Sequence, residues 1–168
     1  MKATTIAKIE SMFRNYLTKF SPKFVVSQYS SGRLYFLDKL KLDVPEYSYI
    51  PPENWSRKLW GINFRSPIMN SAGMFKNGEC YEMVARQGAG AYLGGTGTWN
   101  PRRGNEKNGI YLPFVPYPKS HSASNWLGLP NDGDEVNSQR AQQLRRIADT
   151  RIGCSIMGSP DFQGEEKL

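Results

Sequence analysis

The residues best suited to chemistry lie in one short stretch, N-S-A-G-M-F-K-N-G-E, at positions 70–79. Residues 66–69 before it read as a short strand, and Asn77 is a plausible N-cap for a helix over residues 78–87. Small residues at such a strand-to-helix turn let a ligand approach the backbone, whose free N–H groups suit an anion, and Lys76 supplies a mobile cation. The stretch therefore predicts a ligand-binding turn.

Two further predicted strands end in residues of the same kind. Residues 89–94 lead into Gly-Gly-Thr, which ends at Thr96, and the strand predicted at 151–157 carries Ser155 near its end. Ligands of parallel barrels bind at the carboxyl ends of the strands. Three strand ends without bulk make room for a flat ring system, and the hydroxyls of Thr96 and Ser155 can hydrogen-bond its polar edge. Together with Lys76, they predict a site for a flat cofactor.

A second candidate site lies in the polar, proline-rich excursion at residues 99–131. Asn125 has both a donor and an acceptor, which suits a ring with alternating carbonyl and N–H groups, and Gly128 lets backbone amides come near. The alternative is a structured loop in which Asn125 caps a turn and Trp126 fills a gap. The spacing alone slightly favours this structural interpretation.

The elements that position these residues repeat in the order strand, helix, strand, long loop, helix, strand. A helix is predicted over residues 134–150, a short strand at 110–114 and the start of another helix at 160–168. Such a repeat predicts parallel strands with helices outside. A closed (β/α)₈ barrel takes about 250 residues, so residues 59–168 supply roughly three of its eight strands. The predicted fold is α/β, the N-terminal portion of a TIM barrel preceded by a small helical segment.

The predicted helical segment spans residues 1–43 and is followed by a proline-rich linker at 44–58. Apolar residues recur at three- and four-residue intervals over residues 5–20, with basic residues elsewhere, and a second apolar, basic segment follows over 24–42. We expect a helical cap on the protein's own core, ahead of an interfacial helix pair that lies on a membrane or surrounds an apolar ligand. A mitochondrial presequence is disfavoured because Glu10 interrupts the acid-poor pattern.

Charge and cysteine content restrict the partners. The formal net charge is +7, but residues 1–65 hold 11 Lys or Arg against 5 Asp or Glu, and residues 66–168 hold 11 against 10. This uneven distribution argues against a nucleic-acid partner. Cys80 and Cys154 lack metal-site spacing and are expected to be small buried thiols in a reducing compartment. No stretch reaches the roughly 20 apolar residues of a spanning helix, so we expect a cytoplasmic or peripherally membrane-associated protein without a bound metal.

The chain resembles the dihydroorotate dehydrogenase family. The resemblance implies an FMN-binding (β/α)₈ barrel that oxidises dihydroorotate to orotate in pyrimidine synthesis, with this chain as its N-terminal part. Five motifs carry it in order and spacing: S-P-I-M-N-S-A-G-M-F-K-N-G-E (66–79), G-A-G-A-Y-L-G-G-T-G-T (88–98), P-R-R-G-N (101–105), N-W-L-G-L-P-N-D-G (125–133) and I-G-C-S-I-M-G (152–158).

The resemblance also implies roles for individual residues. Lys76 matches a lysine between flavin and substrate, and the catalytic base, a Ser or Cys after the fourth strand, lies beyond Leu168, so that no residue of this chain is assigned as the base. His121 is expected to be a solvated or turn residue. The residues implied to contact FMN are Ala72, Gly73, Met74, Lys76, Gly95, Thr96 and Ser155. Those implied to hold the substrate are Lys76, Asn125, Trp126, Leu127, Gly128 and Leu129.

Departures from the family pattern point to two different classes within the family. Lys76 and the basic amphipathic front are typical of the membrane-associated, quinone-using class, but Phe75 replaces its Asp and Ser155 replaces its Asn. Gly95 stands where the soluble class has a flavin-site lysine, and Ser155 is shared with that class. The balance slightly favours quinone and a membrane surface as partners through residues 1–43, besides dihydroorotate and orotate, and leaves a homo-oligomer open. The alternatives are a flavin oxidoreductase for another dihydropyrimidine, or an inactive fragment that binds flavin or a nucleotide.

Overall fold

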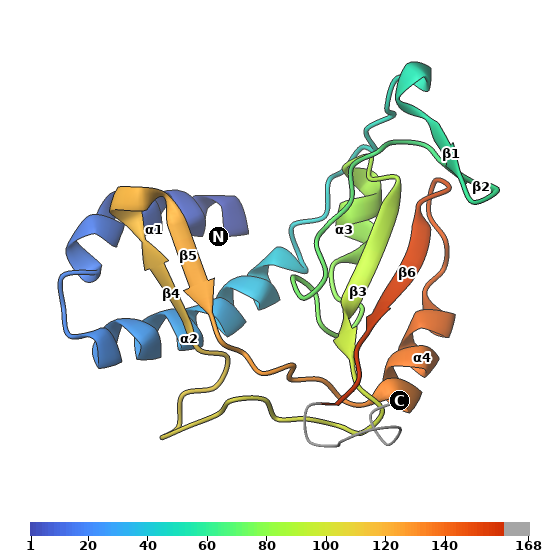
Figure 1. Cartoon of the computed structure of the whole chain (residues 1–168). Coiled ribbons are helices and arrows are strands. Elements are labelled where there is room, and N and C mark those ends of the chain that lie inside the picture. The colour runs from blue at the N-terminus through green and yellow to red at the C-terminus, as the bar shows by residue number, and fades with distance from the viewer. Residues whose placement is uncertain (160–168) are drawn as a thin grey trace. The chain divides into compact units, whose positions relative to one another are not determined.

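The computed structural model describes residues 1–159, and their contacts form two compact units (Figure 1). The first unit combines residues 1–43 with 103–130, and the second combines residues 44–102 with those from Asn131 onward. The predicted helical segment thus shares its unit with part of the excursion that the sequence analysis assigned to the barrel. The helix expected at 160–168 lies outside the described residues.

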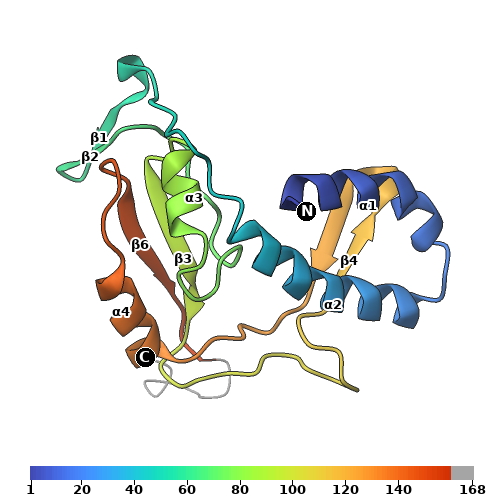
Figure 2. The ribbon, with the colours of Figure 1, turned by 180° about the vertical axis from the view of Figure 1, so that it is seen from behind.

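Two helices form most of the first unit, as predicted. Helix α1 spans Ala3–Leu17 and helix α2 spans Pro22–Leu40, each within three residues of its predicted bounds (Figure 2). The side chain of Ser21 accepts a hydrogen bond from the backbone N–H of Phe24, and Pro22 occupies the first helical turn. A serine cap followed by proline is a strong start signal because proline has no N–H to leave unsatisfied there.

A β-hairpin packs on these helices. Strand β4 (Phe114–Tyr117) pairs antiparallel with β5 (Ser122–Asn125) through the short 3₁₀ turn η2 (Pro118–Ser120). The rings of Tyr29 and Phe114 lie 6.2 Å apart, and the hydroxyl of Ser30 donates to the carbonyl of Tyr111. The strand predicted at 110–114 therefore begins only at Phe114. Its partner was missed because Ser-Ala-Ser-Asn lacks the apolar, β-branched character that indicates a strand.

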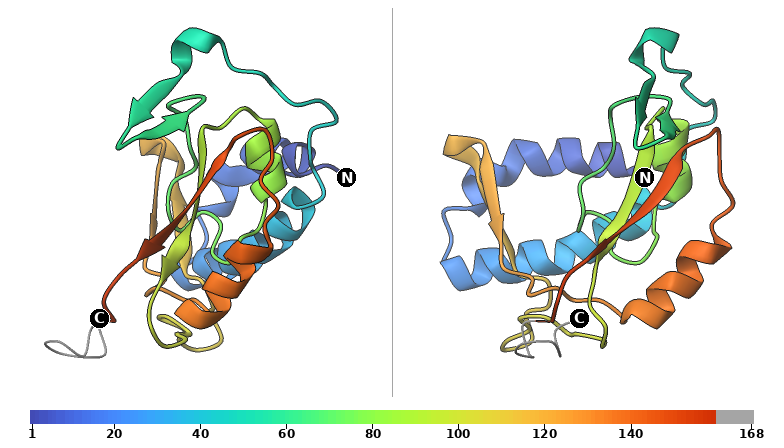
Figure 3. Two further views of the ribbon diagram at one scale, coloured as in Figure 1. Left: turned by 90° about the vertical axis from the view of Figure 1, so that its right-hand side faces the viewer. Right: turned by 45° about the vertical axis from the view of Figure 1, so that its right-hand side comes forward.

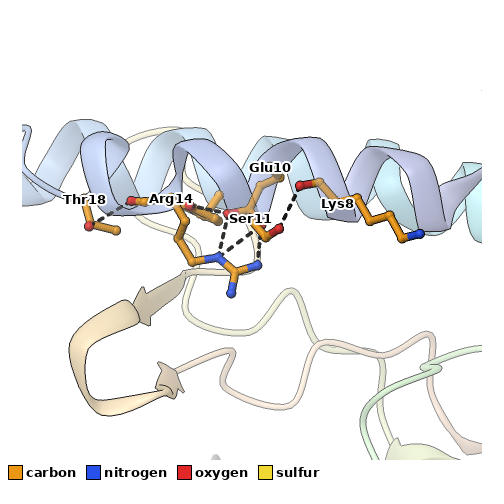
Figure 4. A network of polar contacts seen from close by, with 6 residues as sticks. Lys8, Glu10, Ser11, Arg14 and Thr18 are labelled. Atoms are coloured by element: carbon orange, nitrogen blue, oxygen red, sulfur yellow. Dashed lines mark hydrogen bonds and ion pairs between the residues drawn. The ribbon is translucent and has the colours of Figure 1, made fainter.

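Figure 4 shows a polar cluster along α1 around Glu10 and Arg14, and Tyr29 connects this cluster to α2. Arg14 donates through Nε to Glu10 Oε1 at 2.8 Å and makes a second contact through Nη2, while the hydroxyl of Tyr29 donates to Glu10 Oε1 at 2.6 Å. Partial burial opposes ionisation of Glu10, but the hydrogen bonds from Arg14 and Tyr29 outweigh it, so the pKa of this carboxyl lies below its usual value. Burial and the hydrogen bond to Glu10 raise the pKa of Tyr29.

This cluster predicts a pH-dependent contribution to stability. Because its pKa is lowered on folding, ionised Glu10 stabilises the fold above its unfolded pKa near 4.5, and this contribution is lost as pH falls through the lower folded value. We expect Glu10→Gln to reduce the free energy of unfolding by about 0.5–1 kcal/mol at pH 7. The variant should also lose less of its free energy of unfolding as the pH falls below 4.5, because it has no carboxylate to protonate at this position. Urea unfolding at pH 7 and pH 3 measures both effects.

Asp38→Asn is the matched control, because the carboxylate of Asp38 pairs with Lys41 on the exposed side of α2. It should change the free energy of unfolding little at either pH. Equal losses for the two variants would contradict the inference that Glu10 stabilises the fold more than an exposed carboxylate does.

The second unit contains a parallel strand pair, as predicted. Strand β3 (Ala91–Gly97) lies beside β6 (Arg151–Ile156), with Ala91 opposite Arg151 (Figure 3). The register shifts between Gly94 and Thr96, which leaves Gly95 as a bulge. The strand predicted at 66–69 appears only as a single parallel bridge from Met69 to Ala91. These elements match part of an α/β barrel sheet.

Two helices accompany the pair, with bounds that differ from the predictions. Helix α3 (Tyr81–Arg86) begins after Cys80, whose left-handed φ of 60° ends the preceding turn, so Asn77 is not its N-cap. Helix α4 (Asp134–Gln143) ends seven residues before the predicted bound of 150. The chain turns back toward β6 through Ala148 and Asp149, which both have positive φ and cannot continue a helix.

An antiparallel hairpin lies near the amino end of β6. Strands β1 (Arg57–Leu59) and β2 (Ile62–Phe64) follow the short turn η1 (Glu53–Trp55) and precede the strand expected at 66–69. Positive φ at both residues of the Trp60-Gly61 turn is typical of tight hairpins. The guanidinium of Arg151 donates to the carbonyl of Asn63 and so attaches the hairpin to β6.

An aromatic cluster forms the core beneath β3. The ring of Tyr92 lies parallel to that of Phe75, at a centroid distance of 6.2 Å, and meets the ring of Tyr81 edge-on at 5.4 Å. All three side chains are buried. Because Tyr92 is on β3 and Tyr81 on α3, this cluster holds the helix against the strand.

The guanidinium of Arg65 donates hydrogen bonds to two backbone carbonyls and one hydroxyl near the amino ends of β3 and β6. It donates through Nε to Ala89 O at 3.0 Å and through Nη2 to Thr150 Oγ1 at 2.8 Å, with a third contact from Nη2 to Ala85 O at the end of α3. The buried hydroxyl of Thr150 also donates to Ala89 O, at 3.1 Å. One guanidinium thus connects the start of β3, the start of β6 and the end of α3.

Cysteine placement corrects one prediction. Neither cysteine forms a disulfide within the described residues, and Cys80 is only half-buried and Cys154 is exposed, instead of both being buried. Cys154 lies on β6, whose pairing within residues 1–159 is to β3 alone, so one edge of this strand is uncovered there. Over the same residues, no helix combines the length and hydropathy that crossing a bilayer requires.

Candidate functional site

The carboxyl ends of β3 and β6 bring two predicted cofactor residues together. The hydroxyl oxygens of Thr96 and Ser155 lie 3.0 Å apart, in hydrogen-bond contact across the pair, and both residues are half-buried. Either hydroxyl can turn to a ligand because each has one donor and two acceptor positions. The two hydroxyls thus lie side by side at the strand ends, and their predicted bonding to a flat cofactor stays a prediction.

The segment with the predicted backbone contacts is fastened to β3 by one side chain. The amide of Asn70 donates through Nδ2 to Leu93 O at 2.7 Å and accepts through Oδ1 from Leu93 N at 3.0 Å. The amide of Asn70 thus makes the two hydrogen bonds to Leu93 that the backbone of a neighbouring strand would make, one residue after the Met69 bridge. Ala72 and Met74 follow with exposed side chains, as a segment that presents its backbone to a ligand requires.

Gly95 lets the turn with Lys76 lie directly on β3. The N–H of Gly95 donates to Phe75 O at 2.8 Å, and a Cβ at this position would lie 2.6 Å from Lys76 Cα. No side chain fits there without moving the turn, so the bulge at Gly95 and the position of Lys76 are coupled. Phe75 is buried against Tyr92, which explains why an apolar residue precedes the lysine here.

Glu79 fixes the part of the turn that follows Lys76. The carboxylate of Glu79 accepts from the N–H of Asn77 at 2.6 Å, and its backbone carbonyl accepts from the hydroxyl of Tyr92 at 2.9 Å. Burial, followed by the nearby Glu79 carboxylate, raises the pKa of Tyr92, which stays neutral and keeps this donor. Lys76 is thus presented by a turn fixed on both sides.

Lys76, Gly95 and Ser155 border one recess of about 60 Å³ between β3, β6 and α4. Pockets for drug-sized ligands usually measure about 300–1,000 Å³, so this recess alone is too small for a flavin. The exposed strand ends, their small residues and the lysine nevertheless fit one wall of a flavin site. The described residues 1–159 contain no group of three or more His, Cys, Asp or Glu side chains placed to hold a metal ion.

The predicted substrate loop belongs to the first unit, and the predicted FMN residues belong to the second. Asn125 ends β5 with its side chain exposed, whereas the side chain of Leu127 is buried and serves packing. Asn105 braces the loop, since its Nδ2 donates to Trp126 O and its backbone N–H to Leu127 O, each at 2.8 Å. Gly128 and Leu129 follow with positive φ.

Asn131 is a structural residue that the sequence analysis missed. Its buried amide accepts from the N–H groups of Thr98 and Gly133 and donates to Thr98 Oγ1. Its backbone pairs with Arg102 in both directions, at 2.8 and 2.9 Å. An asparagine directly after proline and before Asp-Gly is a turn signal that could have indicated this role.

Comparison with known proteins gives consistent matches. The sequence profile of the family described as "Dihydroorotate dehydrogenase" matches residues 55–166. A protein of Pseudoalteromonas translucida named "Dihydroorotate dehydrogenase (quinone)" is 31% identical over 108 residues, covering 63% of this chain and 31% of its own length. A protein of Methylobacillus flagellatus with the same name is 33% identical over 122 residues, covering 70% of this chain and 33% of its own length.

The fold has solved counterparts as well. The crystal structure of DHODH from Eimeria tenella in complex with ferulenol matches with a TM-score of 0.68 at 22% identity, over 80% of this chain and 37% of that one. Its ligand-free form matches with a TM-score of 0.61. The chain spans about a third of the length of the curated relatives that it matches. The arrangement described above is therefore part of a larger fold in those proteins.

Proposed function

The chain belongs to the dihydroorotate dehydrogenase family, and on this premise we propose that it forms part of an FMN-dependent enzyme that oxidises dihydroorotate to orotate. The observation that carries the proposal is the meeting of Lys76, Gly95, Thr96 and Ser155 at the carboxyl ends of two parallel strands. This is the edge at which barrels bind their ligands. The names of the relatives support quinone as the final electron acceptor.

The residues of this chain would bind and orient more than they would react. Bound FMN would supply the hydride acceptor. Lys76 would place a positive charge between an anionic substrate and a ring that gains electrons, which stabilises charge where it develops. The backbone of residues 72–74 and the hydroxyls of Thr96 and Ser155 would hold the ring. Asn125 to Leu129 would hold the substrate.

Anaerobic spectroscopy tests this function. The protein that carries this chain is loaded with FMN and mixed with dihydroorotate while its visible absorption is followed. We expect the flavin bands to bleach and to return on addition of a soluble quinone. A flavin that bleaches with dithionite but not with dihydroorotate would contradict the proposed substrate. Bleaching by dihydrouracil instead would indicate another dihydropyrimidine.

Removing the cation should weaken binding of at least one of the two ligands. We expect Lys76→Ala to lower the affinity for FMN or orotate about 10- to 100-fold, because hydrogen bonds to charged groups contribute about 1.5–3 kcal/mol. Quenching of flavin fluorescence measures the first affinity and perturbation of the flavin spectrum by orotate measures the second. Lys58→Ala removes the same charge from an exposed position on β1 and should leave both affinities unchanged. Unaltered binding of both ligands by Lys76→Ala would contradict the assigned role.

We also propose that α1 and α2 contact a membrane surface. Basic residues outnumber acidic ones eight to three over residues 1–43, and many apolar side chains of the two helices are exposed. A basic helix with exposed apolar residues suits the interface of anionic lipid. The exposed apolar residues are Ile9, Met12, Phe13, Tyr16, Leu17, Phe20, Phe24, Leu34 and Tyr35.

Vesicle sedimentation tests this contact. We expect binding to vesicles that contain anionic lipid, weaker binding to neutral ones, and a loss of binding in the double variant Met12→Ser, Phe13→Ser. Tyr47→Ser, which alters an even more exposed aromatic residue in the linker, is the control and should bind as the unaltered protein does. Equal binding by all variants would contradict the involvement of α1.

A further inference from the structure

The ammonium of Lys76 lies beside Gly73, three residues earlier in the same turn. Gly73 has a φ of +81°, and a Cβ at this position would lie 3.3 Å from Lys76 Nζ. Apart from the two chain neighbours of Gly73, no other heavy atom of residues 1–159 comes within 4 Å of that Cβ position. Within the described residues, the space that a side chain at position 73 would need is therefore bordered by this ammonium alone.

The backbone explains how the side chain of Lys76 comes to lie there. The N–H of the residue after Gly73 donates to Ser71 O at 3.3 Å, which closes a turn with Gly73 at its third position. A positive φ at that position is typical of a type II turn and favours glycine. The N–H of Gly95 donates to Phe75 O, so the backbone beside Lys76 is fixed on β3. The flexible stem of the lysine extends from this fixed point back to the turn.

A side chain at position 73 would move the charge before it moved the backbone. A distance of 3.3 Å is shorter than an ordinary van der Waals contact of a Cβ, so a methyl group there would push Nζ of Lys76 away. The lysine stem rotates freely, whereas the backbone on both sides is hydrogen-bonded. Because hydrogen bonds from a charged donor depend on distance and direction, the displaced ammonium would bind an anionic ligand less well.

We propose that Gly73 is a positioning residue: its lack of a side chain sets where the Lys76 ammonium lies, and with it the affinity for the anionic substrate. This places the charge beside residues 72–74, the segment expected to contact FMN. The position of the ammonium stands on the geometry of this chain alone. The consequence for orotate rests on the proposed flavin function.

Nuclear magnetic resonance tests the position of the ammonium without flavin. The protein that carries this chain is labelled with a carbon isotope at the Cε atoms of its lysines, and Lys76→Arg identifies the Lys76 signal by its absence. We expect Gly73→Ala to shift this signal. Gly78→Ala is the matched control, because its φ of +83° is equally unsuited to alanine but its Cβ would meet only Leu144 Cδ1, at 3.9 Å. A Lys76 signal that does not move in Gly73→Ala, or moves equally in both variants, would overturn the positioning role.

Urea unfolding shows whether the side chain or the backbone yields. Alanine at a positive φ is strained in both Gly73→Ala and Gly78→Ala, so we expect the two variants to lower the urea midpoint by similar amounts. A much larger drop for Gly73→Ala would mean that the turn itself is forced to move, which would overturn the proposal.

A double-mutant cycle tests the consequence for the substrate in the FMN-loaded protein. We expect Gly73→Ala to weaken orotate binding about two- to tenfold when Lys76 is present, the lower range for residues in contact, and to have no further effect in the Lys76→Ala variant. Gly78→Ala should show no such coupling. An equal loss with and without Lys76 would show that residue 73 acts through its own backbone and would overturn the proposal. Failure of the unaltered protein to bind orotate would instead overturn the proposed substrate, while the Lys76 signal still reports where the ammonium lies.

Discussion

Replacing Gly90 with alanine is expected to cause a large loss of stability. A Cβ at position 90 would lie 1.8 Å from the carbonyl oxygen of Ser66 and within 3 Å of two further backbone atoms of that residue. Backbone cannot rotate away as a side chain does. The N–H of Gly90 donates to Ile68 and its carbonyl accepts from Arg151, so three chain segments meet at this point. We expect a loss of about 3 kcal/mol or more, at the upper end of overpacking effects.

Gly94→Ala provides a matched control on the same strand. A Cβ at position 94 would meet only the carbonyl oxygen of Gly153, at an ordinary contact distance of 3.5 Å. We expect its free energy of unfolding to change by less than about 1 kcal/mol. Urea unfolding followed by circular dichroism compares the two variants. Similar midpoints would contradict the close approach at Gly90.

The other large loss is expected for Arg65→Met. Methionine retains an unbranched apolar stem but removes the hydrogen bonds to Ala85, Ala89 and Thr150. Burial lowers the pKa of the Arg65 guanidinium, yet the group remains charged at neutral pH, and hydrogen bonds from charged donors are the stronger kind. We expect a loss of about 2–3 kcal/mol, since Thr150 still satisfies Ala89 O.

Two further substitutions define the origin of this loss. Arg65→Lys preserves the charge but not the fork that reaches three oxygens, so it should recover less than half of the stability. Arg151→Met removes a single hydrogen bond from a more exposed arginine and should cost about 1 kcal/mol or less. Full recovery by Arg65→Lys, measured by the same urea unfolding, would show that charge alone matters.

The fold class could be predicted because periodicity and order are properties of the sequence. Alternation of strand and helix predicted the parallel pairing of β3 and β6, and the three- and four-residue apolar repeats predicted α1 and α2. The bounds were less predictable. Helix α4 ends early because Leu144 is extended rather than helical, which its residue type does not indicate.

Contacts between distant segments account for what the sequence could not predict. Arg65 looks like any basic residue after a strand, and its role depends on Thr150, 85 residues later. The hairpin β4–β5 was missed because a hydroxyl-rich strand is stabilised by packing on α2 rather than by its own propensity. Such pairings are set by the tertiary structure.

For the candidate site, the sequence predicted which residues would bind ligands, and these roles stay predictions. The proximity of Thr96 and Ser155 at parallel strand ends could be expected from the order of the elements. Sequence gave no sign that Gly95 makes room for the lysine turn, that Phe75 stacks on Tyr92, or that Asn77 and Asn137 share a recess. Each depends on a close approach between elements, which no spacing rule describes.

The backbone pairing of Arg102 with Asn131 has a consequence for how this protein can change. It brings together the two points at which residues 103–130 leave and rejoin the second unit. The length of the intervening segment is therefore uncoupled from the register of β3 and β6, and doubling a loop's length costs only about 0.6 kcal/mol of closure entropy. Insertions, deletions and exchanges within this segment can therefore occur during evolution while β3 and β6 keep their pairing.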